Sequence, residues 1–496
     1  MLISKSENIM KIRYIAVILA AILFTGCNKF LDIRPTGMVI ARTGEDYRAL
    51  LTEKYLRVPC DRSRTDLRTN DVKVDFSTTT GLNYYNYYFD MWSWNDYNKL
   101  ENAEGCHWID YYEVLYISNY IIEHKNEIEE ASVDEINQLV GESYMMRAYM
   151  HFLLVNIYSP AYTKCNPSSS RGIPLQLRAD IRDVLRCSSV EQVYRQIMED
   201  IDMAEGYMNV EKWGEGYTYR FSKITANALR ARVALYMGNW QLAFDEAKKV
   251  IAKYPDLVDL KSSSTMPNNY ESVESILALE IEDSNFKVDK DGNGFVWLSD
   301  DMLELYGVDL SLTSFKDKKI VAEFIDLRIL SGNFTRIGTN GKFYDYDSGK
   351  YQFSLKPKGR NSNDYRCTFR ASEFYLIASE AANELGNISE ATQYLKELMK
   401  RRFESKSYDK KVQLIDAMSQ DELRTEILNE RHREFVLQGH NWFDLRRTTQ
   451  PQLTKEYIVD GNILGTYVLE ENDSRYTMPI PTAAVAANPE LEIWPY

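Results

Sequence analysis

The sequence is poor in the features that most hydrolytic sites and nucleic-acid surfaces require. It holds five histidines, and neither an HExxH metal motif nor a G-x-S-x-G nucleophile turn occurs. Lys and Arg number 59 against 73 Asp and Glu, for a formal net charge of -14, so the overall field repels phosphate backbones. No apolar run of about 18 residues, the length of a membrane span, follows the N-terminal region. These absences argue against nucleic acid as a partner and against a membrane span in the remaining chain.

Cysteine is also scarce, and its spacing predicts no site. The chain has six cysteines. Apart from Cys27 they are Cys60, Cys106, Cys165, Cys187 and Cys367. This odd number without CxxC spacing predicts neither a zinc site nor a complete disulfide framework. Scattered buried thiols are the simpler expectation.

The N-terminus carries the pattern of an export signal. Lys11 and Arg13 precede an apolar stretch over residues 15–24, and small residues follow directly before Cys27. A charged region, a short apolar region and a small-residue cleavage site predict a signal peptide over residues 1–26, with Met10 as its candidate start. The Cys after the small pair resembles the bacterial lipobox, so Cys27 is the predicted lipidation site. An ordinary cleaved signal with an incidental Cys is the alternative.

Helical periodicity is clearest over residues 222–257. The first apolar stripe, spaced i, i+4, i+7 and i+11, comprises Ile224, Ala228, Ala231 and Leu235. After the break at Gly238 the second stripe comprises Trp240, Ala243, Ala247 and Val250. Two amphipathic helices joined by a tight turn form an αα-hairpin, and the positions of its small residues match a tetratricopeptide repeat. The same pattern returns around Gly386.

The rest of the chain alternates helical and irregular stretches. Residues 142–159 can pair with 189–208 as a third hairpin. We therefore predict a mainly α fold, in which tetratricopeptide-like helical hairpins form a scaffold with long loop-rich insertions and short β-hairpins. The helices occupy about 110–255 and 370–445, with a loop-rich region at about 57–108 and an irregular insertion at about 256–369, all in one domain over 27–496. Because the copies are far apart, we expect a bundle of hairpins rather than a continuous solenoid.

Four stretches, in this order, carry a family resemblance. They are "CNKFLDIRPTG" from Cys27, "GIPLQL" from Gly172, "FRASEFYLIASEAANELGN" from Phe369 and "ILNERHREFVLQGHNWFDLRR" from Ile427. Together they resemble the SusD/RagB family of outer-membrane nutrient-binding lipoproteins. The last stretch is the most specific match, although His432 and the ending "EIWPY" depart from the family pattern.

The resemblance implies a function as well as a fold. It implies a lipoprotein anchored to the outer membrane and exposed at the cell surface, with no catalytic activity and no required cofactor. It further implies an oligosaccharide ligand on the loop-rich side. A SusC-like TonB-dependent transporter would be the partner on which the protein closes as a lid. A receptor for peptides or glycoproteins, and a surface glycoside hydrolase, remain the alternatives.

The stretch "NYYNYYFDMWSW", residues 83–94, suggests where a sugar would bind. Seven of its twelve residues are aromatic, and sugar rings stack their C–H faces on aromatic rings while polar groups bind their hydroxyls. The candidate glycan-binding residues are Tyr84, Tyr85, Tyr87, Tyr88, Trp92, Trp94, Asn95 and Asp96, with Trp297 from the mid-chain insertion. Strict alternation fails, so a strand would have two aromatic faces. Packing of most of these rings against helices is the alternative.

Residues 289–300, which include Trp297, have the spacing of a possible calcium-binding loop. In "DKDGNGFVWLSD", Asp289, Asp291, Asn293 and Asp300 occupy positions 1, 3, 5 and 12 of an EF-hand-type loop. Asp300 is shorter than the Glu usually found at position 12. A Gly-Asn-Gly hairpin tip explains the same residues.

One constellation near the C-terminus has the composition of an active site. It comprises Glu430, Arg431, Glu434, Asp444 and Arg446. Their spacing along a helix and its exit favours an ion-pair network that stabilises the fold, in line with the resemblance to non-enzymatic proteins.

Overall fold

The structure is a computed structural model that describes most of the chain. The described residues are 41–74, 76, 79–96, 105–263, 265–280, 296–309, 322–330, 334–336, 344–345, 350–351, 353–355, 368–459 and 462–491. In this part of the chain no helix is both long enough and apolar enough to cross a bilayer.

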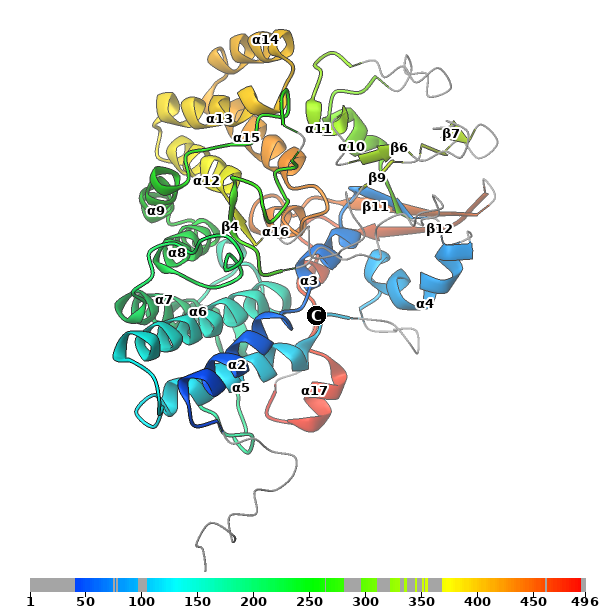
Figure 1. Ribbon diagram of the computed structural model, residues 1–496. Helices are drawn as coiled ribbons and strands as arrows, with labels where there is room; N and C mark the ends of the chain where they lie inside the picture. Colours follow the sequence, from blue (N-terminus) through cyan, green and yellow to red (C-terminus); the bar gives the residue numbers. More distant parts are fainter. Residues whose placement is uncertain are drawn as a thin grey trace, which may run out of the picture.

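Nine helices form an array on one side of the described chain (Figure 1). They are α5 (Trp108–Glu123), α6 (Val133–Tyr158), α7 (Val190–Tyr207), α8 (Lys223–Met237), α9 (Trp240–Lys253), α12 (Ala371–Glu384), α13 (Ile388–Arg402), α14 (Ser405–Asp416) and α15 (Gln420–Glu434). The pairs α6/α7, α8/α9 and α12/α13 each pack as antiparallel hairpins. The predicted mainly α fold with tetratricopeptide-like hairpins is confirmed.

The turns of two hairpins depend on glycine. Gly238 ends α8 with φ of +71°, and Gly386 follows α12 with φ of +80°. Side chains other than glycine adopt this left-handed conformation at a cost, so each Gly ends one helix and allows the next to reverse. The apolar stripes are buried as expected, with Ala231 and Ala243 fully buried at the α8–α9 contact.

The hairpins form one continuous row in space. α7 packs on α8, and α9 packs on α12 although more than 100 residues separate them. The expectation of a bundle without a continuous array is therefore wrong. The insertion begins after α9 and ends before α12. These two helices are therefore neighbours in space although they are far apart in the sequence.

Local capping explains where several helices begin. Ser132 precedes α6, and its hydroxyl accepts a hydrogen bond from the Glu135 backbone N–H (3.2 Å) while the Glu135 carboxylate accepts one from the Ser132 backbone N–H (2.8 Å). Ser419 and Glu422 form the same reciprocal pair at α15. Such capping boxes satisfy backbone donors that the first helical turn leaves without partners.

The remaining elements are short and lie mostly on the other side of the array. The helices are α2 (Gly44–Tyr55), α3 (Asp61–Arg64), η1 (Thr65–Arg68), α4 (Thr79–Trp92), η2 (Tyr162–Lys164), α10 (Asp300–Leu305), α11 (Leu327–Leu330), α16 (Asn441–Arg447), η6 (Ser474–Tyr476) and α17 (Thr482–Ala487). Figure 1 shows α3, α4 and α10 on the side opposite α7, α8 and α9.

All strand pairs in the described residues are antiparallel and two-stranded. They are β1 (Val72–Val74) with β5 (Val296–Leu298), β2 (Arg171–Pro174) with β3 (Cys187–Ser189), β4 (Ser275–Leu277) with β10 (Phe369–Arg370), β6 (Phe334–Arg336) with β9 (Phe353–Leu355), β7 (Tyr344–Asp345) with β8 (Lys350–Tyr351), and β11 (Leu453–Val459) with β12 (Asn462–Leu469). One apolar core runs from α2 through the array to β11 and β12.

The region expected to be loop-rich, residues 57–108, contains more regular structure than the sequence suggested. It includes α3, η1, β1 and the 14-residue helix α4. The expectation is therefore wrong for residues 79–92.

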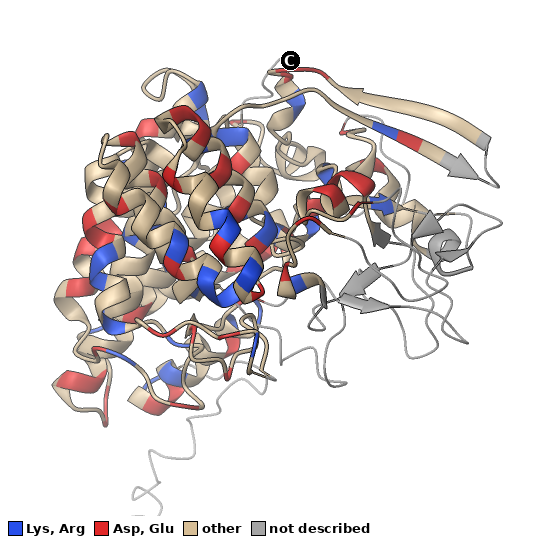
Figure 2. Cartoon of the chain, turned by 90° about the horizontal axis from the view of Figure 1, so that it is seen from above, with Lys and Arg blue, Asp and Glu red and all other residues tan. Residues whose placement is uncertain are grey.

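Residues of both charge signs are interspersed along the described helices in Figure 2.

Candidate functional site

The aromatic run lies on α4, and helical spacing explains its composition. Tyr85, Phe89 and Trp92 fall at i, i+4 and i+7 and so share one face of the helix. That face packs on the β11–β12 hairpin: the rings of Phe89 and Tyr457 lie 5.6 Å apart, as do those of Trp92 and Tyr467. The run is aromatic on this side because it fills the space between a helix and a hairpin.

The two tryptophans do not present a ring to solvent. Trp92 is 2% exposed and Trp94 is 1% exposed. The Trp94 indole N–H donates to the Arg68 carbonyl oxygen (2.9 Å), and the Lys455 ammonium lies 4.2 Å from the Trp94 ring centroid. The prediction that these tryptophans form an exposed sugar platform is therefore wrong, because both belong to the core.

Three further predicted residues are also occupied by contacts within the protein. Tyr88 is buried at 1% exposure. Both oxygens of the buried Asp96 carboxylate accept from the Arg68 guanidinium at 2.9 Å. The half-buried Asn95 donates its side-chain amide to Asp90 (2.7 Å). The expectation that Tyr88 and Asp96 face a ligand is wrong for the same reason as for the tryptophans.

What remains accessible is the outer face of α4. Tyr87 is 40% exposed, next to the exposed Asn86, and Tyr84 is half-buried one helical turn earlier. The Tyr84 ring packs against the Tyr88 ring, with 5.7 Å between their centroids. We call Tyr84, Asn86 and Tyr87 the α4 outer face, in which Tyr84 and Tyr87 are neighbours one helical turn apart and Asn86 lies on the other side of Tyr87.

The mid-chain insertion meets this region through a small sheet. β1, four residues before α4, pairs with β5, so that Lys73 lies opposite Trp297. The side chain of Trp297 lies outside the described residues, but its strand is joined to the segment that leads into α4. The N-terminal and mid-chain segments predicted to share a site are thus adjacent.

The calcium prediction remains a prediction. Asp289, Asp291 and Asn293 lie outside the described residues. Asp300 begins α10, and its carboxylate accepts from the Lys73 ammonium at 2.6 Å. The described residues contain no group of three or more His, Cys, Asp or Glu side chains placed to hold a metal. The predicted lipidation site, Cys27, also lies outside the described residues.

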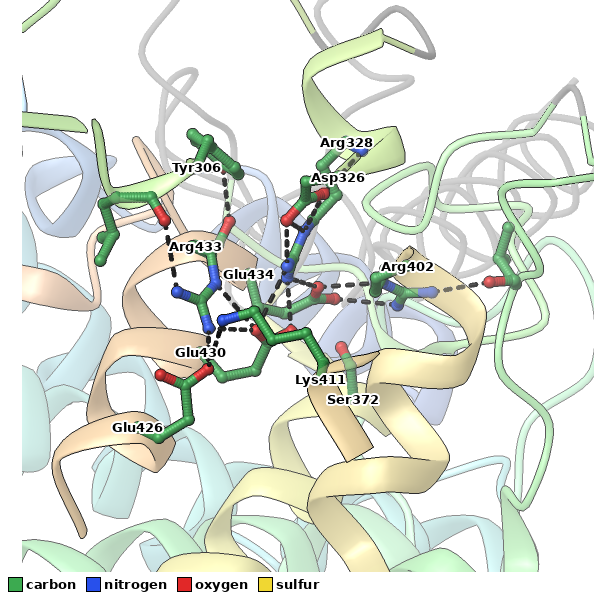
Figure 3. Close-up of polar contacts among 12 residues, drawn as sticks. Tyr306, Asp326, Arg328, Ser372, Arg402, Lys411, Glu426, Glu430, Arg433 and Glu434 are labelled. Carbon is green, nitrogen blue, oxygen red and sulfur yellow. Dashed lines mark hydrogen bonds and ion pairs between the residues drawn. The ribbon is translucent and has the colours of Figure 1, made fainter. Parts of the chain in front are cut away.

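The C-terminal constellation forms buried ion pairs, as predicted, and Figure 3 shows those around Glu430 and Glu434. Glu434 accepts from the guanidinium groups of Arg402 (2.9 Å), Arg328 (2.9 Å) and Arg370. Burial would raise the pKa of Glu434, but Arg402 and Arg370 outweigh it and hold this pKa well below its usual range. Glu430, on the same helix as Glu434, pairs with Arg328 of α11 at 2.8 Å.

The rest of the constellation is paired in the same way. Arg431 and Arg447 both donate to Asp444, at 3.1 and 2.8 Å. Arg446 donates to the backbone carbonyls of Asn156 and Ser159. Every carboxylate of the set is bound by a guanidinium, which leaves none placed as a free acid or base for hydrolysis.

The more distant partners in this network could not be predicted from the sequence. Arg328 comes from the insertion, and Arg370 and Arg402 from the hairpin α12–α13 and its entry strand. The members predicted from the sequence, namely Glu430, Arg431, Glu434, Asp444 and Arg446, all lie within one short stretch near the C-terminus. The helical spacing of Tyr84 with Tyr88 and of Tyr85 with Phe89 could have shown that α4 is a helix.

Family models match both ends of the chain. One, described as "SusD family", matches residues 331–496, and a second, described as "Starch-binding associating with outer membrane", matches residues 29–235. Among curated relatives, SusD-like protein P38 of Formosa agariphila is 22% identical and spans 98% of this chain and 99% of its own. SusD-like protein P2 of the same organism is 23% identical over 77% of this chain and 78% of its own.

Solved structures share the fold. A SusD superfamily protein from Bacteroides thetaiotaomicron aligns with a TM-score of 0.71 at 22% identity, covering 92% of this chain and all of that one. A laminarin-binding SusD-like protein aligns with a TM-score of 0.57 at 16% identity, covering 82% and 92%. An array of helical hairpins with irregular segments on its other side is thus the fold of the SusD superfamily. With matches of both family models along the chain, this is a SusD-like protein.

Proposed function

We propose that the protein is a cell-surface lipoprotein that captures an oligosaccharide and passes it to a SusC-like TonB-dependent transporter. The family description of a starch-binding protein associated with the outer membrane supports the ligand class and the location. The laminarin-binding structural neighbour supports glycan capture by this fold. The protein performs no chemistry on the glycan, and its carboxylates in the C-terminal constellation serve the fold.

The α4 outer face is the observation that carries the binding proposal. Tyr87 offers an accessible ring, Asn86 offers an amide donor and acceptor, and Tyr84 lies one turn away. Because α4 is fixed from behind by Phe89 and Trp92 in the core, these groups are presented on a rigid element. A sugar that stacks on Tyr87 therefore requires little reorganisation of the protein.

A binding assay tests this site. Titration of purified protein with oligosaccharides, chosen from an array of neutral glycans, should give saturable binding that Tyr87→Ala weakens about tenfold, since one ring stack contributes about 1 kcal/mol or more. Leu414→Ala on α14 is the matched control, because Leu414 is 49% exposed on the helical array. Unchanged affinity in Tyr87→Ala would remove the α4 outer face as the site.

Two further assays on the same purified protein distinguish the alternative functions. New reducing ends after incubation would show a hydrolase. Binding of peptides with no glycan bound across the array would instead favour a peptide receptor.

Lipid attachment is tested independently. Metabolic labelling with a fatty acid should label the wild-type protein, and Cys27→Ser should abolish the label. Surface exposure should make the wild-type protein accessible to protease added to whole cells. Co-purification of a TonB-dependent transporter with the tagged protein would support delivery to that partner.

A further inference from the structure

A pocket of about 470 Å³ lies at the start of α2, away from α4. Its walls come from the first turns of α2 and α6 and from the connection between α7 and α8. Pockets that bind small ligands typically enclose about 300 to 1,000 Å³, so this one has room for a single sugar ring and its substituents.

A buried carboxylate fixes the polar floor of the pocket. Glu142 is fully buried and accepts from Arg48 (2.7 and 3.2 Å) and from Arg220 (2.7 and 3.2 Å). Tyr55 and Gln138 also donate to it, at 2.9 and 3.0 Å. A guanidinium has five N–H donors, so both arginines keep donors beyond those used on Glu142. Their positions are set before any ligand arrives.

An aromatic wall adjoins this floor. The Trp213 indole N–H donates to the Phe221 carbonyl oxygen at 2.8 Å, and the Arg220 guanidinium lies 3.9 Å from the Trp213 ring centroid. These two contacts hold the half-buried ring at one side of the pocket. Ile136 and Val210 add apolar surface to the lining.

The charges at the rim select the ligand class. Glu45, Glu130 and Asp134 line the pocket, are exposed, and have no side-chain ion pair among the described residues. Their carboxylates can accept hydrogen bonds from hydroxyl groups, but they repel phosphate, sulfate and uronic acids. The charges of Arg48 and Arg220 are already shared with Glu142. The ligand that fits is uncharged, rich in hydroxyls and apolar on one face.

We propose that this pocket is a second sugar-binding site, which takes one neutral sugar residue against Trp213 with its hydroxyls on Arg48 and the rim carboxylates. The proposal rests on the proposed glycan-binding function and adds a contact point on the helical side of the molecule. Such a site would hold a second part of a branched glycan, or a second chain, while the α4 outer face holds the first. Two weak sites on one protein raise the effective affinity for a glycan that reaches both.

Saturation-transfer NMR on the full-length protein tests the pocket directly, with methyl glucosides, methyl galactosides and methyl mannosides as probes and glycerol as the non-sugar control. All variants carry Tyr87→Ala, so that the α4 outer face does not contribute to the signal. At least one methyl glycoside should receive magnetisation from Tyr87→Ala alone, and adding Trp213→Ala should reduce that signal about tenfold, through loss of the aromatic wall. Val210→Trp, which fills the pocket while keeping the backbone hydrogen bond of Val210 to Gln138 (3.0 Å), should do the same and serves if Trp213→Ala does not fold.

Leu414→Ala is the matched control for the second site, because Leu414 is 49% exposed on α14 and belongs neither to the pocket nor to the α4 outer face. Added to Tyr87→Ala, it should leave the methyl glycoside signal unchanged. No transfer from any methyl glycoside, or an undiminished signal in Val210→Trp, overturns the second site. If oligosaccharide binding still depends on Tyr87 in that case, the proposed function stands without it, so the two failures can be told apart.

Discussion

Replacing Trp92 with alanine should destabilise the protein rather than merely weaken ligand binding. Trp92 is 2% exposed and lies against Phe76, Phe89 and Tyr467, with ring centroids 6.1, 5.7 and 5.6 Å away. Removing a buried Trp side chain costs about 3 to 5 kcal/mol, because apolar contacts are lost and a cavity remains.

The expected shift in melting temperature follows from the size of the chain. Unfolding entropy is about 2.1 cal/mol/K per residue, or about 1 kcal/mol/K over 496 residues. A loss of about 4 kcal/mol therefore lowers the melting temperature by about 4 °C. Differential scanning calorimetry of the wild type and Trp92→Ala measures this shift.

Tyr87→Ala is the control, since a ring 40% exposed on the same helix should shift the melting temperature by less than about 1 °C. The reasoning fails if Trp92→Ala has the melting temperature of the wild type but loses glycan binding, because Trp92 would then be a surface ring. It also fails if both variants are equally destabilised.

Two further predictions concern buried charges. Glu434→Gln should cost about 3 to 5 kcal/mol, because it leaves Arg328, Arg370 and Arg402 without their shared carboxylate. Since the pKa of Glu434 is lowered, its contribution is fully present above about pH 5 and is lost only as the pH falls through the lowered value. Denaturant titration checks this against the exposed control Glu199→Gln, and equal stability of the two variants would contradict it. The hydrogen bond of His107 to Asp61 (2.7 Å) outweighs burial and raises the pKa of His107. Its stabilisation is therefore fully present below about pH 6.5 and disappears as the pH rises through the raised value. The melting temperature of the wild type relative to His107→Gln should show this, and a difference that grows with pH would refute it.

The helical hairpins could be predicted because their signals are local. Ala231, Gly238 and Ala243 lie within a few turns of one another, and their spacing alone specifies two helices and a reversal. The continuous row could not be predicted, since the packing of α9 on α12 depends on where a long insertion returns.

The candidate site was harder to predict because its residues have more than one possible role. Trp92 and Trp94 have the composition of a sugar platform, and only the β11–β12 hairpin, far away in the sequence, shows that they are covered. Asp96 is committed to Arg68, 28 residues earlier. The sequence singled out the α4 segment as a candidate, but burial by distant elements decides which of its side chains reach solvent.

The charge network shows how this chain holds distant segments against the helical scaffold. Arg328 from the insertion and Arg370 at the entry to α12 both bind Glu434 of α15. Buried pairs of this kind add little net stability, but their directional hydrogen bonds define where each segment joins the scaffold. Position is thus set by buried charges, and the proposed glycan contact of Tyr87 does not involve them.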